Sequence, residues 1–117
     1  MYHGWSDQDI APQASINFYR RAIDATTTAP GTANWIRLFM VPGMGHCTGG
    51  EGPDTFDKIS VIERWVKKGE APTRVIAAHN TAGKVDRTRP LCPYPQVAHY
   101  TGVGSTNDAA NFACKVP

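Results

Sequence analysis

Long apolar segments are missing from this sequence. Its longest strongly apolar run extends only from Ile36 to Val41, far short of the roughly 20 residues that a membrane-spanning helix requires. Clusters of like charge are also missing, because the 12 basic and 10 acidic residues are dispersed and the longest basic runs are pairs such as Lys67-Lys68. We therefore expect no transmembrane helix, and no partner among nucleic acids or membrane surfaces.

A secretory signal peptide is not apparent either. Residues 1–10 lack the basic and then apolar order of such a signal, and they resemble the passage from a strand into a loop. We expect them to lie inside a domain whose N-terminal portion is missing from the chain. The composition, with 41% hydrophobic and 19% charged residues among 117, is that of one small globular domain.

Cysteine is scarce, and its number is odd. Of the three cysteines, one must be free or bonded to a thiol outside this chain. Cys92 and Cys114 bracket a segment with few signals of regular structure, and a disulfide between them would stabilise it by roughly 3 kcal/mol in the loop-entropy model. We predict that pairing in preference to two free thiols. A disulfide indicates an oxidising compartment, so we expect a secreted or periplasmic protein.

The most informative stretch begins with the apolar run from Ile36 to Val41. This run has the composition of a strand buried in a parallel sheet, and Pro42 ends it because proline cannot donate to a strand ladder. A glycine-rich loop then carries His46 and Cys47. Open α/β sheets place functional residues just beyond the C-terminal ends of their strands, although a surface histidine in a flexible loop accounts equally well for this pattern.

Asp7 occupies an equivalent position near the N-terminus. Tyr2 and His3 are predicted to end a strand, which places Asp7 in the loop beyond it. The segment 13–25 has apolar residues at helical spacing, namely Ile16, Tyr19 and Ile23. We therefore predict a strand, a helix and a second strand, with an acidic residue after the first strand and a histidine after the second.

The fold class predicted for residues 1–83 is α/β. A second helix is predicted to begin near Asp54, its N-cap, and to end at Lys68, and residues 75–78 are predicted to form one more buried strand. This order implies about three parallel strands and two helices, which are too few elements to cover both faces of a sheet. Residues 84–117 have little periodicity. We predict that they form an irregular tail, held in place by the Cys92–Cys114 disulfide and packed on residues 1–83.

In α/β-type serine hydrolases the triad residues occur along the chain in the order nucleophile, acid, histidine. An acid followed by a histidine is the second part of this order. In such a pair a buried carboxylate holds the imidazole in one tautomer and stabilises the imidazolium formed when the ring accepts the nucleophile's proton. The G-x-S-x-G elbow that would carry the nucleophile does not occur in the sequence. None of the serines of the chain has the flanking glycines of such an elbow; they are Ser6, Ser15, Ser60 and Ser105.

Four segments together resemble the C-terminal part of the tannase and feruloyl esterase family, which also includes the mono(2-hydroxyethyl) terephthalate hydrolases. They are YHGWSD from Tyr2, RLFMVPGMGHC from Arg37, RPLCPYP from Arg89 and DAANFAC from Asp108. The resemblance extends over essentially the whole chain, and VPGMGHC is a highly specific motif. It implies the C-terminal part of an α/β-hydrolase sheet, from an enzyme with an inserted lid that cleaves esters of aromatic acids such as gallate and ferulate.

By position, the resemblance makes Asp7 the triad acid and His46 the general base. In the family, the cysteine directly before the nucleophilic serine bonds to the cysteine directly after the catalytic histidine, so Cys47 is expected to pair with a cysteine upstream of Met1. The serine, the oxyanion hole and the lid are not among these residues, and the family's structural calcium site lies in the lid. We therefore expect no cofactor in this chain and no triad-dependent activity from the chain alone.

Two other site assignments stay open. Asp9 is a second candidate for the acid, or it begins the helix. A zinc site formed by His46, Cys47 and another histidine is chemically conceivable, but these residues lack a typical zinc-ligand spacing. His3 and His99 are expected to pack or to hydrogen bond rather than to catalyse, and His79 is expected to end a strand.

The competing function belongs to a different class. The chain would then be a non-catalytic binding or interaction domain derived from half of a hydrolase sheet, with the exposed sheet edge and the glycine-rich loop as contacts. In either case a bare sheet edge and the unpaired Cys47 predict that the chain associates with itself.

Overall fold

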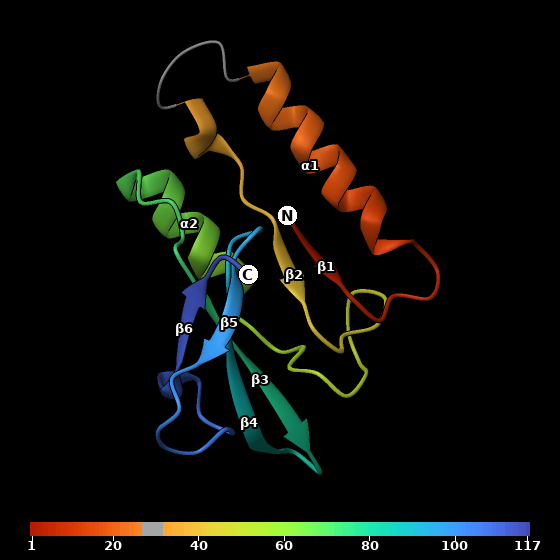
Figure 1. Cartoon of the computed structure of the whole chain (residues 1–117), viewed down its shortest axis with the longest axis vertical. Helices are drawn as coiled ribbons and strands as arrows, with labels where there is room; N and C mark the ends of the chain where they lie inside the picture. Colours follow the sequence, from red (N-terminus) through yellow and green to blue (C-terminus); the bar gives the residue numbers. More distant parts are fainter. Residues whose placement is uncertain (27–31) are drawn as a thin grey trace.

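Two short parallel strands and the helix between them position the candidate site (Figure 1). The computed structural model describes residues 1–26 and 32–117. Strands β1 and β2 pair in parallel, with Tyr2 opposite Phe39. The bounds are Tyr2–Gly4 for β1, Pro12–Thr26 for helix α1, Thr32–Trp35 for the 3-10 turn η1 and Phe39–Val41 for β2. The predicted order of strand, helix and strand is therefore confirmed.

The side chains around β2 alternate between two hydrophobic clusters. Leu38 and Met40 pack with Ile16 of α1 on one side, whereas Phe39 and Val41 lie in a second cluster that Val61 packs against. This alternation follows from the pleat of an extended chain, in which successive side chains point to opposite faces. The pair formed by β1 and β2 therefore separates the two parts of the core.

Strand β2 is shorter than the predicted run from Ile36 to Val41. Ile36 and Leu38 are buried as expected, but neither pairs with β1. The carbonyl of Leu38 instead accepts a hydrogen bond from the backbone N–H of Tyr94 at 2.7 Å, and Phe39 forms an isolated bridge with Pro93. A later segment of the chain therefore lies along this edge of β2.

The prediction of a third parallel strand is wrong. Strand β3 pairs in antiparallel fashion with strand β4, and within the described residues every sheet has two strands. Ala82 and Gly83 join the two strands with φ angles of 50° and 78°, and two positive φ angles are what a tight hairpin connection requires. The bounds are Val75–Thr81 for β3 and Lys84–Leu91 for β4.

The prediction of an irregular tail over residues 84–117 is also wrong. That region holds β4, a second antiparallel pair formed by β5 and β6, and the 3-10 turn η2. The bounds are Val97–Tyr100 for β5, Ala109–Asn111 for η2 and Phe112–Lys115 for β6. The division expected between residues 83 and 84 falls inside the turn of the β3–β4 hairpin, so strand pairing crosses it.

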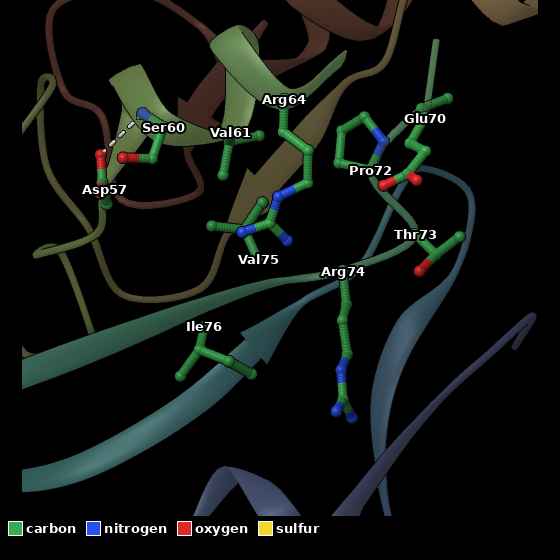
Figure 2. Close-up of a pocket in the computed structure, with 11 residues that line it drawn as sticks. Asp57, Ser60, Val61, Arg64, Glu70, Pro72, Thr73, Arg74, Val75 and Ile76 are labelled. Carbon is green, nitrogen blue, oxygen red and sulfur yellow. Dashed lines mark hydrogen bonds between the residues drawn. The ribbon is translucent and has the colours of Figure 1, made fainter. Parts of the chain in front are cut away.

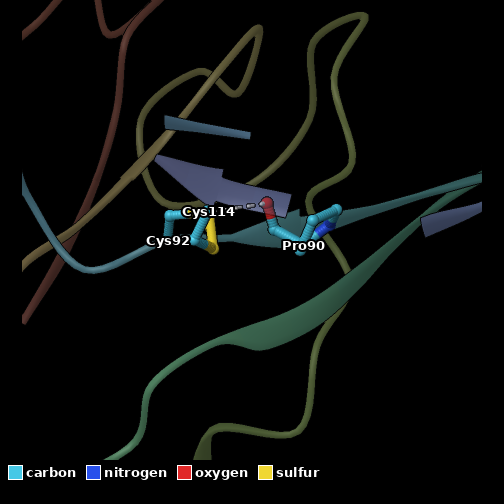
Figure 3. Close-up of a disulfide and its surroundings, with 3 residues drawn as sticks. All are labelled: Pro90, Cys92 and Cys114. Carbon is cyan, nitrogen blue, oxygen red and sulfur yellow. Dashed lines mark hydrogen bonds between the residues drawn. A yellow bond between two sulfur atoms is a disulfide. The ribbon is translucent and has the colours of Figure 1, made fainter. Parts of the chain in front are cut away.

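The predicted disulfide between Cys92 and Cys114 is present. It joins the residue after β4 to strand β6, next to Pro90 (Figure 3). Cys92 is buried, and the two Cα atoms are 5.5 Å apart. The disulfide therefore ties the β5–β6 pair to the end of the β3–β4 hairpin.

Helix α2 begins later than predicted, at Lys58, and ends at Lys68. Its N-cap is Asp57 rather than Asp54: the Asp57 carboxylate accepts the backbone N–H of Ser60 at 2.9 Å (Figure 2). Gly69 ends the helix in the left-handed conformation, as expected of a C-terminal glycine.

No residue of α2 is fully buried. Ile59, Ile62 and Val66 are 69%, 52% and 81% exposed, and they follow one another at helical spacing. The helix therefore presents an apolar stripe that the described residues leave uncovered. Neither α2 nor any other helix in the described part of the chain has the length and apolar character needed to span a membrane.

Candidate active site

The loops that follow β1 and β2 lie against each other because the two strands run in parallel. The N–H of Trp5 donates to the carbonyl of Val41 at 2.9 Å, and the N–H of Ser6 donates to the carbonyl of Met44 at 3.0 Å. Gly4 permits this approach, since a Cβ atom at that position would collide with the carbonyl oxygens of Met44 and of the following glycine. The absence of a side chain at the end of β1 therefore lets the second loop reach the first.

This contact brings Asp7 and His46 together. Oδ2 of Asp7 lies 2.9 Å from Nδ1 of His46, so Nδ1 carries the hydrogen and Nε2 of the ring keeps its lone pair. The Asp7 side chain is only 3% exposed, whereas that of His46 is 45% exposed. A buried carboxylate thus holds a histidine whose other side is open to solvent.

His46 opens into a hollow of about 410 Å³. Asp9 and Ser6 of the first loop and Glu51 of the second loop contribute to its walls. The hollow lies beyond the C-terminal ends of β1 and β2, where open α/β sheets bind their ligands.

Asp7 is held ionised by the chain that surrounds it. Its Oδ1 accepts the backbone N–H groups of Asp9 and Ile10, each at 2.9 Å. The N–H of Ile10 is the largest influence that lowers the pKa of Asp7 to about 2, and His46 and the N–H of Asp9 lower it further against an opposing effect of burial. The carboxyl group is therefore an anion at any physiological pH.

The same pair alters His46 in the opposite direction. The hydrogen bond to Asp7 is the main cause that raises the pKa of His46 above 6.5, the charge of Asp7 adds to it, and Asp9 contributes a smaller electrostatic effect. A carboxylate next to an imidazole favours the imidazolium in this way. The ring is therefore a stronger base than an isolated histidine.

A second histidine contacts the same carboxylate, and sequence reasoning missed its place in the site. His3 hydrogen bonds, as expected, with Nδ1 at 2.7 Å from Oγ of Ser15 and Nε2 at 3.1 Å from the carbonyl of Ile10, but its Nε2 also lies 3.0 Å from Oδ2 of Asp7. One feature of the sequence could have indicated that His3 lies near Asp7, namely its position at the end of the strand that leads into the Asp7 loop.

The other candidate for the acid, Asp9, does not hydrogen bond to His46 in this geometry. Among the described residues, Asp7, Asp9 and His46 are nonetheless the one group of three metal-ligating side chains whose atoms lie within 4.8 Å of one another. The group does not include Cys47. A cation would also have to displace the donors that already occupy both oxygens of Asp7, so these residues do not fit a metal site such as that of calcium.

The loop that carries His46 is braced by residues that come after it. The carboxylate of Asp54 accepts the N–H of Gly49 at 2.7 Å and the hydroxyl of Thr48 at 2.9 Å. From β4, the guanidinium of Arg87 donates to the carbonyl of Glu51. Asp54, which was predicted to cap a helix, instead fixes the shape of the histidine loop.

Cys47 follows His46 in the left-handed conformation, with φ at 66°. Its thiol is free and exposed. Non-glycine residues rarely adopt this conformation, and here it turns the chain sharply directly after His46.

The remaining histidines lie apart from this group of contacts. His79 of β3 pairs with Asp86 of β4, with Nδ1 and Oδ1 at 2.7 Å, and Thr81 donates to the other oxygen of Asp86 at 2.6 Å. Nδ1 of His99 lies 2.9 Å from the carbonyl of Tyr100. His99 therefore hydrogen bonds, as expected, whereas His79, which was expected to end a strand, lies within β3.

A further hollow of about 480 Å³ lies between α2 and the start of β3. Figure 2 shows Arg64 reaching from α2 towards Val75, while Arg74 extends away from Arg64. The polar side chains of this hollow do not converge on a common point, and neither Asp7 nor His46 lines it.

A buried carboxylate follows one parallel strand, a histidine follows the next, and one hydrogen bond joins them, which is the geometry of the acid–histidine pairs of α/β hydrolases. The chain belongs to the tannase and feruloyl esterase family, whose model matches residues 1–115. The family match indicates a carboxylic ester hydrolase family.

Similar sequences carry related names. The chain is 47% identical over 120 residues to a mono(2-hydroxyethyl) terephthalate hydrolase of Piscinibacter sakaiensis, covering 100% of this chain and 19% of that protein. It is 40% identical over 118 residues to a probable feruloyl esterase of Arthroderma benhamiae, covering 97% of this chain and 22% of that protein.

Solved structures agree. The chain is similar to feruloyl esterase B from Aspergillus oryzae, with a TM-score of 0.80 and 26% identity over 97% of this chain and 26% of that one. It is also similar to a tannin acyl hydrolase from Aspergillus niger, with a TM-score of 0.73 and 28% identity over 99% of this chain and 22% of that one. The chain therefore spans about a fifth to about a quarter of the length of these proteins.

Proposed function

We propose that this chain supplies the acid and the histidine of a serine carboxylic ester hydrolase, and that the nucleophilic serine comes from residues outside it. The observation that carries this proposal is the 2.9 Å hydrogen bond between Asp7 and His46, with the opposite side of the imidazole facing an open hollow. That arrangement is the one a general base needs.

In this function Nε2 of His46 takes the proton of the serine hydroxyl as the serine oxygen attacks the ester carbonyl. Asp7 stays ionised and stabilises the imidazolium through Nδ1–H. The imidazolium then passes its proton to the oxygen of the leaving alcohol, and an acyl-enzyme remains. Water, deprotonated by His46 in the same way, releases the acid, and the proton returns to the serine.

The substrate class we propose is an ester of an aromatic acid of the gallate or ferulate type. The names of the relatives support it, since they include a terephthalate monoester hydrolase, a feruloyl esterase and a tannin acyl hydrolase. We also propose a secreted or periplasmic location, which the Cys92–Cys114 disulfide supports. The exposed thiol of Cys47 is available for a disulfide to a cysteine next to the serine.

A chimeric enzyme tests the proposal. Residues 1–117 replace the matched segment of the Piscinibacter sakaiensis hydrolase, and hydrolysis of mono(2-hydroxyethyl) terephthalate and of a feruloyl ester is measured. We expect ester turnover that falls by at least about 10³-fold in the His46→Ala variant and is unchanged in the matched His99→Ala variant. Turnover that survives His46→Ala would reject the proposal. The isolated chain should show no turnover that depends on His46.

One observation favours the alternative of an interaction domain. The apolar stripe formed by Ile59, Ile62 and Val66 on α2 is exposed, and exposed apolar surfaces often mark contact sites. An inactive chimera, together with tight partner binding by the isolated chain that is lost in Ile62→Ser, would favour this alternative over the hydrolase.

A further inference from the structure

Two arginines of β4 share one face of the strand. Arg87 and Arg89 are two positions apart, so the pleat of the strand directs both side chains to the same side. Both residues are half-buried. Within residues 1–26 and 32–117, neither forms an ion pair with a carboxylate. Two positive charges therefore lie on one face of the hairpin without a counter-charge from the described residues.

Neighbouring groups orient both guanidinium groups. The central carbon of the Arg89 guanidinium lies 4.1 Å from the ring centroid of Phe112, and its Nη1 donates to the carbonyl of Thr88 at 2.9 Å. Nη2 of Arg87 donates to the carbonyl of Glu51. Because each guanidinium has five N–H donors in a fixed plane, these contacts orient the two groups and leave further donors for an acceptor beside them.

A hollow of about 420 Å³ is lined by the two arginines. Its other walls come from the histidine loop, from Pro90 and from β5, and most of these residues are apolar. Among the described residues that line it, Glu51 is the one acid, and it contacts Arg87 through its backbone carbonyl. The apolar wall residues are Pro42, Pro53, Pro90, Val97 and Ala98.

The composition of this hollow selects one class of ligand. Small-molecule sites combine apolar walls with a few polar groups that fix orientation, and arginine binds a carboxylate through two parallel N–H bonds. Burial lowers the pKa of Arg89, and the charge of Arg87 lowers it further, so an anion between them would offset their repulsion. A neutral apolar molecule would provide no counter-charge, and an inorganic anion would leave the apolar walls without a contact.

We propose that this hollow binds a small carboxylate with an apolar body, such as an aromatic acid, and that Arg87 and Arg89 donate to its carboxylate. The hollow adjoins that of His46, because Gly43 and Glu51 line both, but His46 does not line it. The inference goes beyond the proposed function and does not depend on it. If that function holds, the acid it releases belongs to this class of ligand.

The test is an NMR titration of the full chain with ¹⁵N-labelled arginine and histidine, and benzoate is the probe. We expect saturable shifts of the Nε–H signals of Arg87 and Arg89. Benzyl alcohol has the ring without the charge, and acetate has the charge without the ring. Both should bind at least about tenfold more weakly than benzoate, because each lacks one of the two contributions.

Variants locate the site. Arg87→Gln and Arg89→Gln should each weaken benzoate binding at least about tenfold, since each removes a charged donor. Arg74→Gln is the matched control and should leave binding unchanged, because Arg74 lines a different hollow. Glu51→Gln should strengthen binding by removing a negative charge from the hollow.

A fourth variant keeps both arginines. Val97 is 47% exposed on β5, and Val97→Glu adds a carboxylate to the hollow, so benzoate binding should be lost. Circular dichroism reports whether each variant is folded, and Val97→Glu provides the test if an arginine variant unfolds.

Three results would overturn the inference. The first is equal binding of benzoate and benzyl alcohol, which would assign the hollow to apolar ligands alone. The second is unchanged benzoate binding in folded Arg89→Gln or Val97→Glu. The third is a saturable shift of the His46 ring without a shift of the arginine signals, which would place the carboxylate on the imidazolium. No ester turnover is measured, so an inactive chimera would reject the proposed function and leave this test intact.

Discussion

Oδ2 of Asp7 lies 2.9 Å from Nδ1 of His46, although 39 residues separate the two in the chain. Parallel pairing of β1 and β2 brings the two residues together, because it places the loops that follow both strands at the same end of the strand pair. Gly4 completes the approach by leaving room for the backbone of the second loop. The pair is therefore a consequence of strand direction together with one missing side chain.

The charge of Asp7 should control the basicity of His46. Asp7→Asn keeps the shape of the side chain and removes its charge, so the pKa of His46 should fall towards 6.5, since Asp7 is its main cause of elevation. An NMR titration of the histidine rings measures this. Asp86→Asn, which alters the partner of His79, is the control and should leave His46 unchanged. In the chimera, Asp7→Asn should lower kcat by about 10⁴-fold.

Acid should destabilise the chain through Asp7 in a defined window. The pKa of Asp7 is lowered from 3.8 to about 2 in the folded chain, so the unfolded chain binds more protons between these values. The contribution of Asp7 is fully present above pH 3.8 and is lost as the pH falls through 2. Urea denaturation across this window should give a shallower pH dependence in Asp7→Asn than in the wild type. Identical slopes would contradict the prediction.

His46 should have the opposite pH dependence. Its pKa is raised above 6.5 by Asp7, so its contribution to stability is fully present below pH 6.5 and is lost as the pH rises through the folded value. Catalysis needs the neutral ring, and the acid limb of kcat/KM in the chimera should therefore have its midpoint above pH 6.5. A midpoint below pH 6.5 would assign that limb to another group.

The carboxylate of Asp54 should restrain the histidine loop. In Asp54→Asn the N–H of Gly49 loses a charged acceptor, and we expect its hydrogen exchange to quicken roughly tenfold. Asp57→Asn is the matched control, because Asp57 accepts the N–H of Ser60. It should quicken exchange at the start of α2 and leave Gly49 as it is. Equal exchange of Gly49 in both variants would show that Asp54 does not brace the loop.

The disulfide should carry much of the stability of the C-terminal strands. Replacing both Cys92 and Cys114 by serine releases the closed loop, and the free energy of unfolding should fall by roughly 3 kcal/mol. Urea denaturation measures the change. Cys47→Ser, which removes an exposed free thiol, is the control and should change stability by no more than about 0.5 kcal/mol.

The chain should associate through its exposed thiol and its open strand edge. Cys47 is free and exposed, and within the described residues β1 pairs with β2 alone, which leaves one edge of β1 open. Size-exclusion chromatography should show dimers, and either reductant or the Cys47→Ser substitution should reduce their amount. A weaker association through the strand edge should persist under both of these conditions. A clean monomer with and without reductant would refute this expectation.

The accuracy of the sequence-based predictions depended on how local each signal was. The helix containing Ile16 follows from spacing within one segment, and it forms. The strand pairing of residues 75–78 depends on which distant strand lies beside them, and the prediction that they form a third parallel strand was wrong. Asp54 and Asp57 are both aspartates and therefore equally suitable as N-caps by residue type. Only the structure shows that Asp57 caps α2.

The sequence by itself determined the family of this chain, the acid and histidine after successive strands, and the Cys92–Cys114 pairing, because residue type and order encode these features directly. Only the tertiary structure decided that Nε2 of His3 lies 3.0 Å from the carboxylate of Asp7 and that Asp54 braces the histidine loop. Such contacts join side chains from separate segments, and they exist only once strand pairing has brought those segments within hydrogen-bond distance.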